Sequence, residues 1–200
     1  MHPTEAFRHD ATELRDRIVA EFGFAMIFLS TSEGPRAAHT PVELVDGNLL
    51  RFHLARTNAL VPHLASERAL AVVNGPESYV SARWYEAASQ VPTWNYVAYE
   101  FEGPVHRMED AALPDLLARL SAHHEKRIKD GAPWTMDKMD EKALNALLRG
   151  VVGFEMKIET VRETVKLSQN KPADERERLI AGLKGEGRGA LASLMREITR

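Results

Sequence analysis

The segment at 150–167 constrains the fold more than any other part of the sequence. Its residues alternate apolar side chains, Phe154 and Met156 among them, with charged ones, which is the period of a half-exposed strand. It follows two stretches with helical spacing, 109–128 and 139–149. A late strand that follows helices closes a sheet or barrel more readily than it begins a second domain.

The first 108 residues contain the strands that this late strand would join. Runs of apolar and β-branched residues are separated by turn signals, of which Asp46-Gly47 is a strong hairpin signal. The predicted strands are 24–31, 36–44, 48–55, 69–75, 78–84, 92–102 and 105–108. Pro41 predicts that the second strand bends there or lies at a sheet edge.

Helices are predicted between and after these strands. They cover 11–21, a short stretch within 59–68 capped by Asn58, 109–128, 139–149 and a segment that begins at Pro172. We therefore expect an α+β fold in which residues 1–185 form a single domain built on a small antiparallel β-barrel. A helical tail at 186–200 follows it.

Composition excludes several classes of protein. The chain has 200 residues, 44% of them hydrophobic, and a net charge of −3, so it can bury a core and lacks the basic character of a typical nucleic-acid binder. It has no cysteine, which rules out disulfides and thiolate metal sites. The polar N-terminus and the absence of an apolar run of about 18 residues predict a cytoplasmic protein without a membrane span.

A first candidate site lies in the stretch HLARTN, where Arg56, Thr57 and Asn58 stand between a strand and a predicted helix. Free N–H groups at a helix start and a forked guanidinium suit a phosphate group. The alternative, an ordinary Asn cap beside a solvated arginine, is favoured on spacing alone.

Aromatic residues next to an amide form a second candidate site. Trp84-Tyr85 and Trp94-Asn95-Tyr96 could hold a planar heteroaromatic ligand, with the rings against its faces and the amide at its edge. The alternative is that these rings fill one end of the barrel, and the motif alone favours this alternative.

Polar residues at the end of the late strand form a third candidate. Lys166, Ser168, Gln169 and Asn170 supply donors and acceptors without an evident structural task. A plain polar loop before Lys171-Pro172 would explain them equally well.

The histidines do not predict a metal site. Six of the eight are scattered at positions 39, 53, 63, 106, 123 and 124, and His123 and His124 point apart on a helix. Glu125 beside His124 could act as a base but is expected to face solvent. The sequence also lacks the H-E-x-x-H, G-x-S-x-G, P-loop and G-x-G-x-x-G motifs.

Taken together, these stretches resemble the PaiB-type FMN-binding negative transcriptional regulators. The resemblance runs from about Phe7 to Leu183. It rests on blocks that keep their order, namely HLARTN, GPESYVSARWY, VPTWNY, SAHHE, APW, VVGFEMKIE, KLSQNK and DERERLIAGL. It implies an FMN-binding split β-barrel, antiparallel and of Greek-key type, in a homodimer with flavin sites at or near the subunit interface.

The resemblance also implies roles for individual residues. Arg56 and Asn58 would hold the FMN phosphate, and His39 and Thr40 would follow the edge of the isoalloxazine ring. Trp94 and Asn95 would point to opposite sides of one strand, one of them lining the flavin pocket. The remaining candidates for flavin contact are His53, Thr57, Tyr79, Ser81, Trp84, Lys166, Ser168, Gln169 and Asn170. The loop at 86–90 is shorter than in the family, which changes the expected pocket rim.

Three functions remain open at this point. The first is a regulator in which flavin is a sensed ligand or cofactor, the second a flavin-dependent oxidoreductase using NAD(P)H, and the third a haem-binding split-barrel protein with a histidine on the iron. The family name implies repression. The sequence shows no helix-turn-helix, basic patch or recognition helix, so its residues do not support a DNA or regulatory partner.

Overall fold

A computed structural model describes residues 2–65, 67–86 and 89–198 of the chain. Residues 87–88 of the shortened loop and residues 199–200 of the tail therefore lie outside the described part. The backbone divides into two compact units, each of which is described by itself. Unit 1 comprises Met1–Thr12, Asn74–Tyr99 and Arg162–Arg200, and unit 2 comprises Glu13–Val73 and Glu100–Val161.

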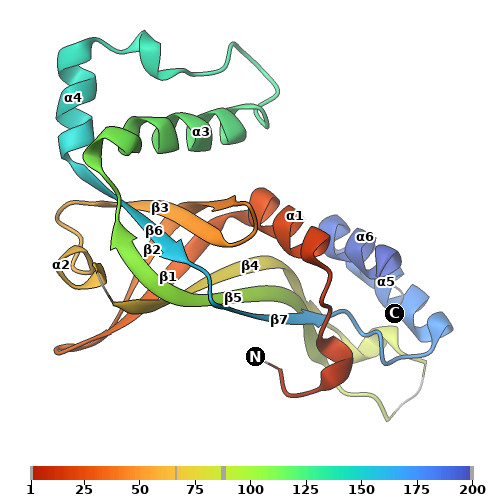
Figure 1. Ribbon diagram of the computed structural model, residues 1–200. Helices are drawn as coiled ribbons and strands as arrows, with labels where there is room; N and C mark the ends of the chain where they lie inside the picture. The colour runs from red at the N-terminus through yellow and green to blue at the C-terminus, as the bar shows by residue number, and fades with distance from the viewer. Residues whose placement is uncertain (1, 66, 87–88, 199–200) are drawn as a thin grey trace. The chain divides into compact units, whose positions relative to one another are not determined.

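The strands form one sheet, as predicted. In the described residues they are β1 (Phe24–Thr31), β2 (Gly34–Val45), β3 (Leu49–Ala55), β4 (Arg68–Val80), β5 (Thr93–Arg107), β6 (Val151–Lys157) and β7 (Thr160–Lys166). Their order is β4-β1-β2-β3-β6-β5-β7, and a further pairing of β4 with β5 curls the sheet into a ring (Figure 1). Strands β4, β5 and β7 run from one unit into the other.

The predicted hairpin at Asp46-Gly47 is confirmed in unit 2. Val45 of β2 pairs with Leu49 of β3 in antiparallel register, and Asp46 and Gly47 both have positive φ, 48° and 69°. Three residues, 46–48, connect the paired positions, and the Asn48 N–H donates to the Val45 carbonyl at 3.2 Å. Positive φ at the centre of such a turn matches the twist of the flanking strands, and glycine adopts it without a steric penalty. The turn thereby sets the register that places β3 against its other neighbour, β6.

The core of unit 2 lies on β3 and β6, which are antiparallel. Phe52 and Phe154 are directly paired, fully buried and stacked with their ring centroids 5.6 Å apart. Leu50 and Met156 pair next to them and are also fully buried. The buried residues of β6 are thus the apolar ones in the alternating pattern from which the sequence predicts a strand at 150–167.

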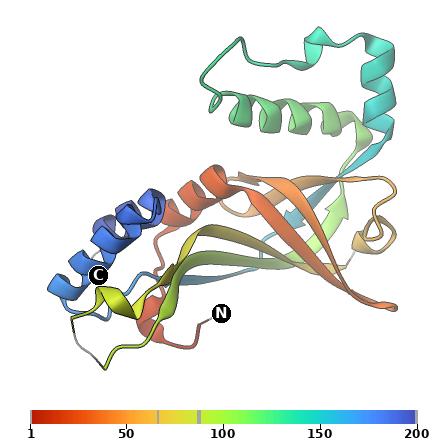
Figure 2. The ribbon, with the colours of Figure 1, turned by 180° about the vertical axis from the view of Figure 1, so that it is seen from behind.

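The helices follow the predicted order. They are α1 (Thr12–Phe22), the single-turn α2 (Val61–Leu64), α3 (Leu113–Glu125), α4 (Glu141–Arg149), α5 (Ala173–Gly185) and α6 (Gly189–Glu197). In unit 2, α3 and α4 form an arm that connects β5 to β6, and both Figure 1 and Figure 2 show the long loop between them. In unit 1, α5 packs against α6, and the short 3-10 helix η2 (Ala82–Trp84) packs against α5.

Unit 1 is tied together by contacts to the two C-terminal helices. Arg176 of α5 donates from its Nη2 atom to the carbonyl oxygens of Met195 and Ile198, which closes the end of α6. Residues Leu191, Ala192, Leu194 and Met195 are buried. The described part of the tail is therefore packed.

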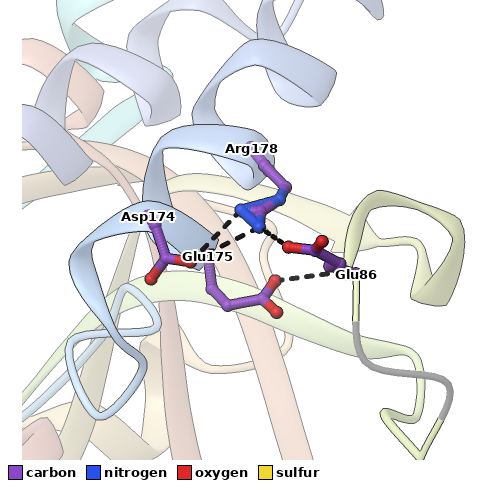
Figure 3. A network of polar contacts seen from close by, with 4 residues as sticks. All are labelled: Glu86, Asp174, Glu175 and Arg178. Atoms are coloured by element: carbon purple, nitrogen blue, oxygen red, sulfur yellow. Dashed lines mark hydrogen bonds and ion pairs between the residues drawn. The ribbon is translucent and has the colours of Figure 1, made fainter.

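A second contact ties α5 to the segment after η2. Arg178 bonds to Asp174 on its own helix and to Glu86, while Glu175 accepts the Glu86 backbone N–H at 3.4 Å (Figure 3). These polar contacts hold the backbone that leaves η2 against the first turn of α5.

Several predicted boundaries are wrong, and prolines explain most of them. The segments 69–75 and 78–84 belong to the single strand β4 up to Val80, and 92–102 and 105–108 are both part of β5. Pro76 lies beyond the last β1 pair at Val72, and Pro104 directly precedes the first β6 pair at Val105. A proline has no N–H to donate, and both prolines lie outside these two ladders.

Pro41 follows the same rule. The strand β2 lies between β1 and β3, so of the two predicted alternatives at Pro41, a bend or a sheet edge, the sheet edge is wrong. Pro41 is the last residue of β2 paired with β1, and the pairing with β3 begins at Val42. Conversely, the predicted late strand is two strands, β6 and β7, with a break at 158–159.

Candidate functional site

A cavity of about 360 Å³ lies in unit 2 beside the HLARTN stretch. Its lining comes from β2, β3, α3 and the loop after α3. The lining residues are Pro41, His53, Leu117, Leu120, Ser121, His124, Glu125 and Trp134. A largely apolar wall with a few polar groups in this size range is typical of small-molecule sites, which span about 300–1,000 Å³.

His53 is the polar group that β3 brings to this cavity. Its Nδ1 atom is buried and has no hydrogen-bond partner among the residues that the structure describes. The Thr40 hydroxyl donates to the His53 carbonyl oxygen at 2.6 Å, which fixes the backbone at this point. Burial lowers the pKa of His53, so the ring is neutral near pH 7 and offers one donor and one acceptor.

The α3 side of the cavity carries a second imidazole. The pKa of His124 is lowered by burial and, to a smaller extent, by the charges of His123 and Arg127. Glu125 accepts the backbone N–H of Trp134 at 2.9 Å and thereby holds the loop that brings the indole to the cavity. Glu125 is half-buried, so the expectation that it faces solvent is wrong.

Sequence reasoning missed His124, Glu125 and Trp134 as site residues. They lie within the blocks SAHHE and APW, which contributed to the resemblance, yet no spacing rule connects them to His53. Their contact with the cavity depends on the long loop after α3, and its path cannot be read from helical or strand periodicity.

The turn at Arg56–Asn58 differs from the predicted phosphate cradle. Asn58 is not the helix cap: its Oδ1 accepts the Leu60 N–H at 2.9 Å, and α2 begins at Val61 without a side-chain cap. Arg56 donates from Nε to the Arg149 carbonyl at 2.7 Å and from Nη2 to the Val151 carbonyl at 3.1 Å. These bonds orient the guanidinium and leave its Nη1 atom without a hydrogen bond in the described residues. Thr57 is exposed.

The other two candidates of unit 2 alternate on β2. His39 is exposed and stacks on Phe24, with ring centroids 6.3 Å apart, while Thr40 is buried and faces the opposite side. Thr40 therefore acts through the backbone of His53, and His39 lies on the outer surface of the strand.

In unit 1, β5 places Trp94 and Asn95 on opposite faces, as predicted. Trp94 is 52% exposed, whereas Asn95 is completely buried. Asn95 and Ser168 exchange hydrogen bonds of 2.9 and 3.1 Å, and the Asn95 amide also contacts the Met195 sulfur at 3.6 Å. Asn95 thus fixes the strand, and its neighbour Trp94 faces outward.

The candidates around η2 make structural contacts. Ser81 accepts the Arg83 N–H at 3.2 Å and caps η2. The Trp84 ring lies directly on Gly182 of α5, where an added Cβ would stand 2.4 Å from Cδ2. Tyr79 lies edge-on to Trp94, with ring centroids 6.3 Å apart.

The polar residues that end β7 also have partners. Lys166 donates to the Thr93 hydroxyl at 2.7 Å and lies over the Phe7 ring, and burial lowers its pKa. Gln169 bonds back to the backbone of its own turn, accepting from the Leu167 N–H at 2.7 Å. Asn170 is exposed.

The predicted residues therefore fall into two groups, one in each unit. His39, Thr40, His53, Arg56, Thr57 and Asn58 belong to unit 2, and the other nine belong to unit 1. Within the described residues, no group of three or more His, Asp or Glu side chains could hold a metal ion. None of the helices in that part of the chain is long and apolar enough to cross a membrane.

The family described as "Putative FMN-binding domain" matches residues 1–160 of this sequence. The chain belongs to this family. It is also 31% identical over 172 residues to the Protease synthase and sporulation protein PAI 2 of Bacillus subtilis (strain 168), a match that covers 84% of this chain and 82% of the relative. An uncharacterized protein of Emericella nidulans is 27% identical over 192 residues, covering 78% and 76% of the two chains.

Solved structures support the split-barrel fold of this FMN-binding domain family member. The FAD and heme binding protein of Mycobacterium smegmatis superposes with a TM-score of 0.61 at 16% identity, over 84% of this chain and 78% of the other. The flavocytochrome Anf3 of Azotobacter vinelandii gives 0.62 at 13% identity, over 83% and 72%. The predicted fold and the PaiB-type resemblance are both confirmed.

Proposed function

We propose that this protein is a PaiB-type regulator that binds FMN, with the isoalloxazine ring in the cavity beside His53. The observation that carries the proposal is the His53 side chain, which lines the cavity and whose buried Nδ1 atom has no partner in the described residues. A buried polar atom of this kind costs stability unless something bonds to it.

The residues present fit a flavin ring. Leu117, Leu120 and Trp134 offer apolar and aromatic surface for its faces, and the neutral rings of His53 and His124 offer a donor and an acceptor for its edge. When bound, FMN would supply one- and two-electron redox chemistry, and the chain's own residues would hold, orient and shield it.

The phosphate of FMN is assigned to Arg56. Its guanidinium is already oriented by the carbonyl oxygens of Arg149 and Val151, so little side-chain entropy would be lost when Nη1 binds an anion.

The proposal extends to the cellular setting. The printed name of the Bacillus subtilis relative refers to protease synthesis and sporulation, which supports a regulatory role over a purely metabolic one. We assign the protein to the cytoplasm as a homodimer of a single domain with a helical tail. A DNA or protein partner would have to be recognised without a helix-turn-helix, which the sequence does not contain.

A titration of purified protein with FMN, followed by quenching of flavin fluorescence, tests the cavity. His53→Phe keeps a ring of similar size but removes both nitrogens. It should weaken FMN binding about tenfold, the loss expected for one buried hydrogen bond, without lowering stability. His106→Phe, at an exposed position of β5, is the matched control and should bind FMN like the unmodified protein. Equal affinities of all three proteins would exclude His53 from the flavin site.

The same cavity supports haem binding as a second candidate, because it brings His53 and His124 into one lining and because two similar structures are named for haem or cytochrome. A Soret band on haem titration that disappears in His53→Phe or His124→Phe would favour this function. An oxidoreductase would instead consume NAD(P)H in steady state, and this activity should depend on Arg56. Flavin reduced without turnover of any donor would favour the regulator.

A further inference from the structure

The outer face of β4 and β5 in unit 1 carries a cleft that the proposed function does not use. Trp94 and Tyr79 meet there with their ring planes at 72° and their centroids 6.3 Å apart. A cleft of about 460 Å³ beside Trp94 is lined by Asn74, Glu77, Trp94, Tyr96 and Val97. We call Trp94, Tyr79, Tyr96, Glu77 and Asn74 the aromatic corner.

Buried neighbours on the same strands hold the aromatic corner in place. Tyr79, which is 47% exposed, lies between Ser78 and Val80, and both of these are buried. Trp94 precedes Asn95, which is locked to Ser168 inside the unit. Because side chains alternate along a strand, the buried residues force both rings outward, so the corner is formed before any ligand arrives.

The chemistry of the aromatic corner selects a cation. Trp94 lines the cleft, with Tyr79 in edge contact beside it, and an indole attracts a cation to its negative π face. The carboxylate of Glu77 adds a formal negative charge to the same cleft. No Lys or Arg side chain lines this cleft in the described residues. An alkylated ammonium group combines a positive charge with an apolar surface, and both complement this lining.

The side chain of Lys166 does not fill this space. Lys166 donates a hydrogen bond to Thr93. Thr93 is two residues before Asn95 on β5, so it lies on the same face of the strand as Asn95 and on the opposite face from Trp94. Its ammonium group lies over Phe7. The corner is thus available to a cation from outside the chain.

We propose that the aromatic corner is a binding site for a small N-alkylated ammonium cation, held by cation–π contact with Trp94, which Tyr79 supports from its side, and by the charge of Glu77. This inference does not depend on flavin binding, since the corner and the His53 cavity share no residue.

Calorimetric titration of the full chain with choline tests the proposal. Choline should bind at least tenfold more tightly than dimethylbutanol, its neutral carbon analogue, because the two differ mainly in charge. Glu77→Gln should weaken choline binding about tenfold, and Trp94→Ala should abolish it. Glu186→Gln changes the net charge equally at an exposed position between α5 and α6 and should leave choline binding unchanged.

Three results would overturn the proposal. Equal binding of choline and dimethylbutanol would make the corner a plain apolar cleft. Competition between FMN and choline would assign Trp94 to the flavin site. A change from dimer to monomer in Trp94→Ala, seen by sedimentation, would make this face a subunit interface. His53→Phe separates this proposal from the flavin assignment, because it should lose FMN affinity and keep choline affinity.

Vesicles of phosphatidylcholine distinguish two sources of the same cationic group. Cosedimentation that Glu77→Gln removes would assign the site to a lipid headgroup. Retained choline binding without cosedimentation would assign it to a free cation.

Discussion

Replacement of Gly182 by alanine should destabilise unit 1 through a single ring. An alanine Cβ at this position of α5 would lie 2.4, 2.6 and 2.8 Å from the Cδ2, Cε2 and Cγ atoms of Trp84. All three distances are below any ordinary van der Waals contact, and a rigid indole cannot bend away from them. Either the ring or the helix must therefore shift.

The expected loss of stability follows from two opposing effects. Overpacking of this kind costs about 1–3 kcal/mol, and a clash with three atoms of a rigid ring belongs in the upper part of that range. Alanine gains up to about 1 kcal/mol over glycine in a helix. The net free energy of unfolding should fall by about 1–2 kcal/mol, which corresponds to roughly 2–8 °C in Tm for a chain of this size.

Gly185 provides the matched control on the same helix. An added Cβ there meets nothing within 4 Å, so Gly185→Ala should leave stability unchanged or raise it by up to about 1 kcal/mol. Both variants are compared by urea unfolding and by thermal melting. The reasoning is refuted if Gly182→Ala is at least as stable as the unmodified protein while Gly185→Ala behaves as expected. Trp84→Ala in the Gly182→Ala background should show non-additive coupling, because it removes the clashing partner.

Two further predictions concern buried polar groups. Asn95→Leu should lower the free energy of unfolding, measured by urea unfolding, by about 1–3 kcal/mol, because the Ser168 hydroxyl loses its two hydrogen bonds to that amide. A loss below about 0.5 kcal/mol would contradict the assigned pairing. Stability should also fall as the pH drops below about 6.5, because the lowered pKa of His53 means that the unfolded chain takes up more protons in this window than the folded chain. The slope from this group stays below about 1.4 kcal/mol per pH unit because one imidazole can differ by at most one bound proton between the folded and unfolded chains. His53→Phe should make the pH dependence of the melting temperature flatter, and an unchanged slope would contradict the assignment of this pH dependence to His53.

Strand existence and strand parity could be predicted because both depend on local alternation. The opposite orientation of Trp94 and Asn95 follows from period two alone and is confirmed by their exposure. Strand ends could not be predicted at Gly75-Pro76 or Gly103-Pro104. These pairs usually mark turns, yet β4 and β5 continue through them, with each proline outside the ladder to β1 or β6 respectively.

The candidate site was predicted less completely than the fold. His53 and Arg56 were identified from a local stretch, but the contacts that define their surroundings come from Arg149, Val151 and Trp134, far along the chain. The helix cap assigned to Asn58 was wrong because Pro62 delays the start of α2, so the Asn58 side chain closes a turn before the helix instead. The chemical character of a side chain can be predicted from the local sequence. Its hydrogen-bond partners depend on which distant segments the sheet places beside it.

Strand β5 connects the two proposed sites through the backbone. Its residues up to Tyr99 belong to unit 1 and include Trp94, and those from Glu100 belong to unit 2, where Val105 pairs with Met156 of β6. A ligand at either site can affect the other only if its binding energy differs between two states of such a shared element. The ratio of FMN affinities with and without saturating choline gives that coupling free energy directly. By linkage, FMN must change choline affinity by the same factor, so the two titrations check each other.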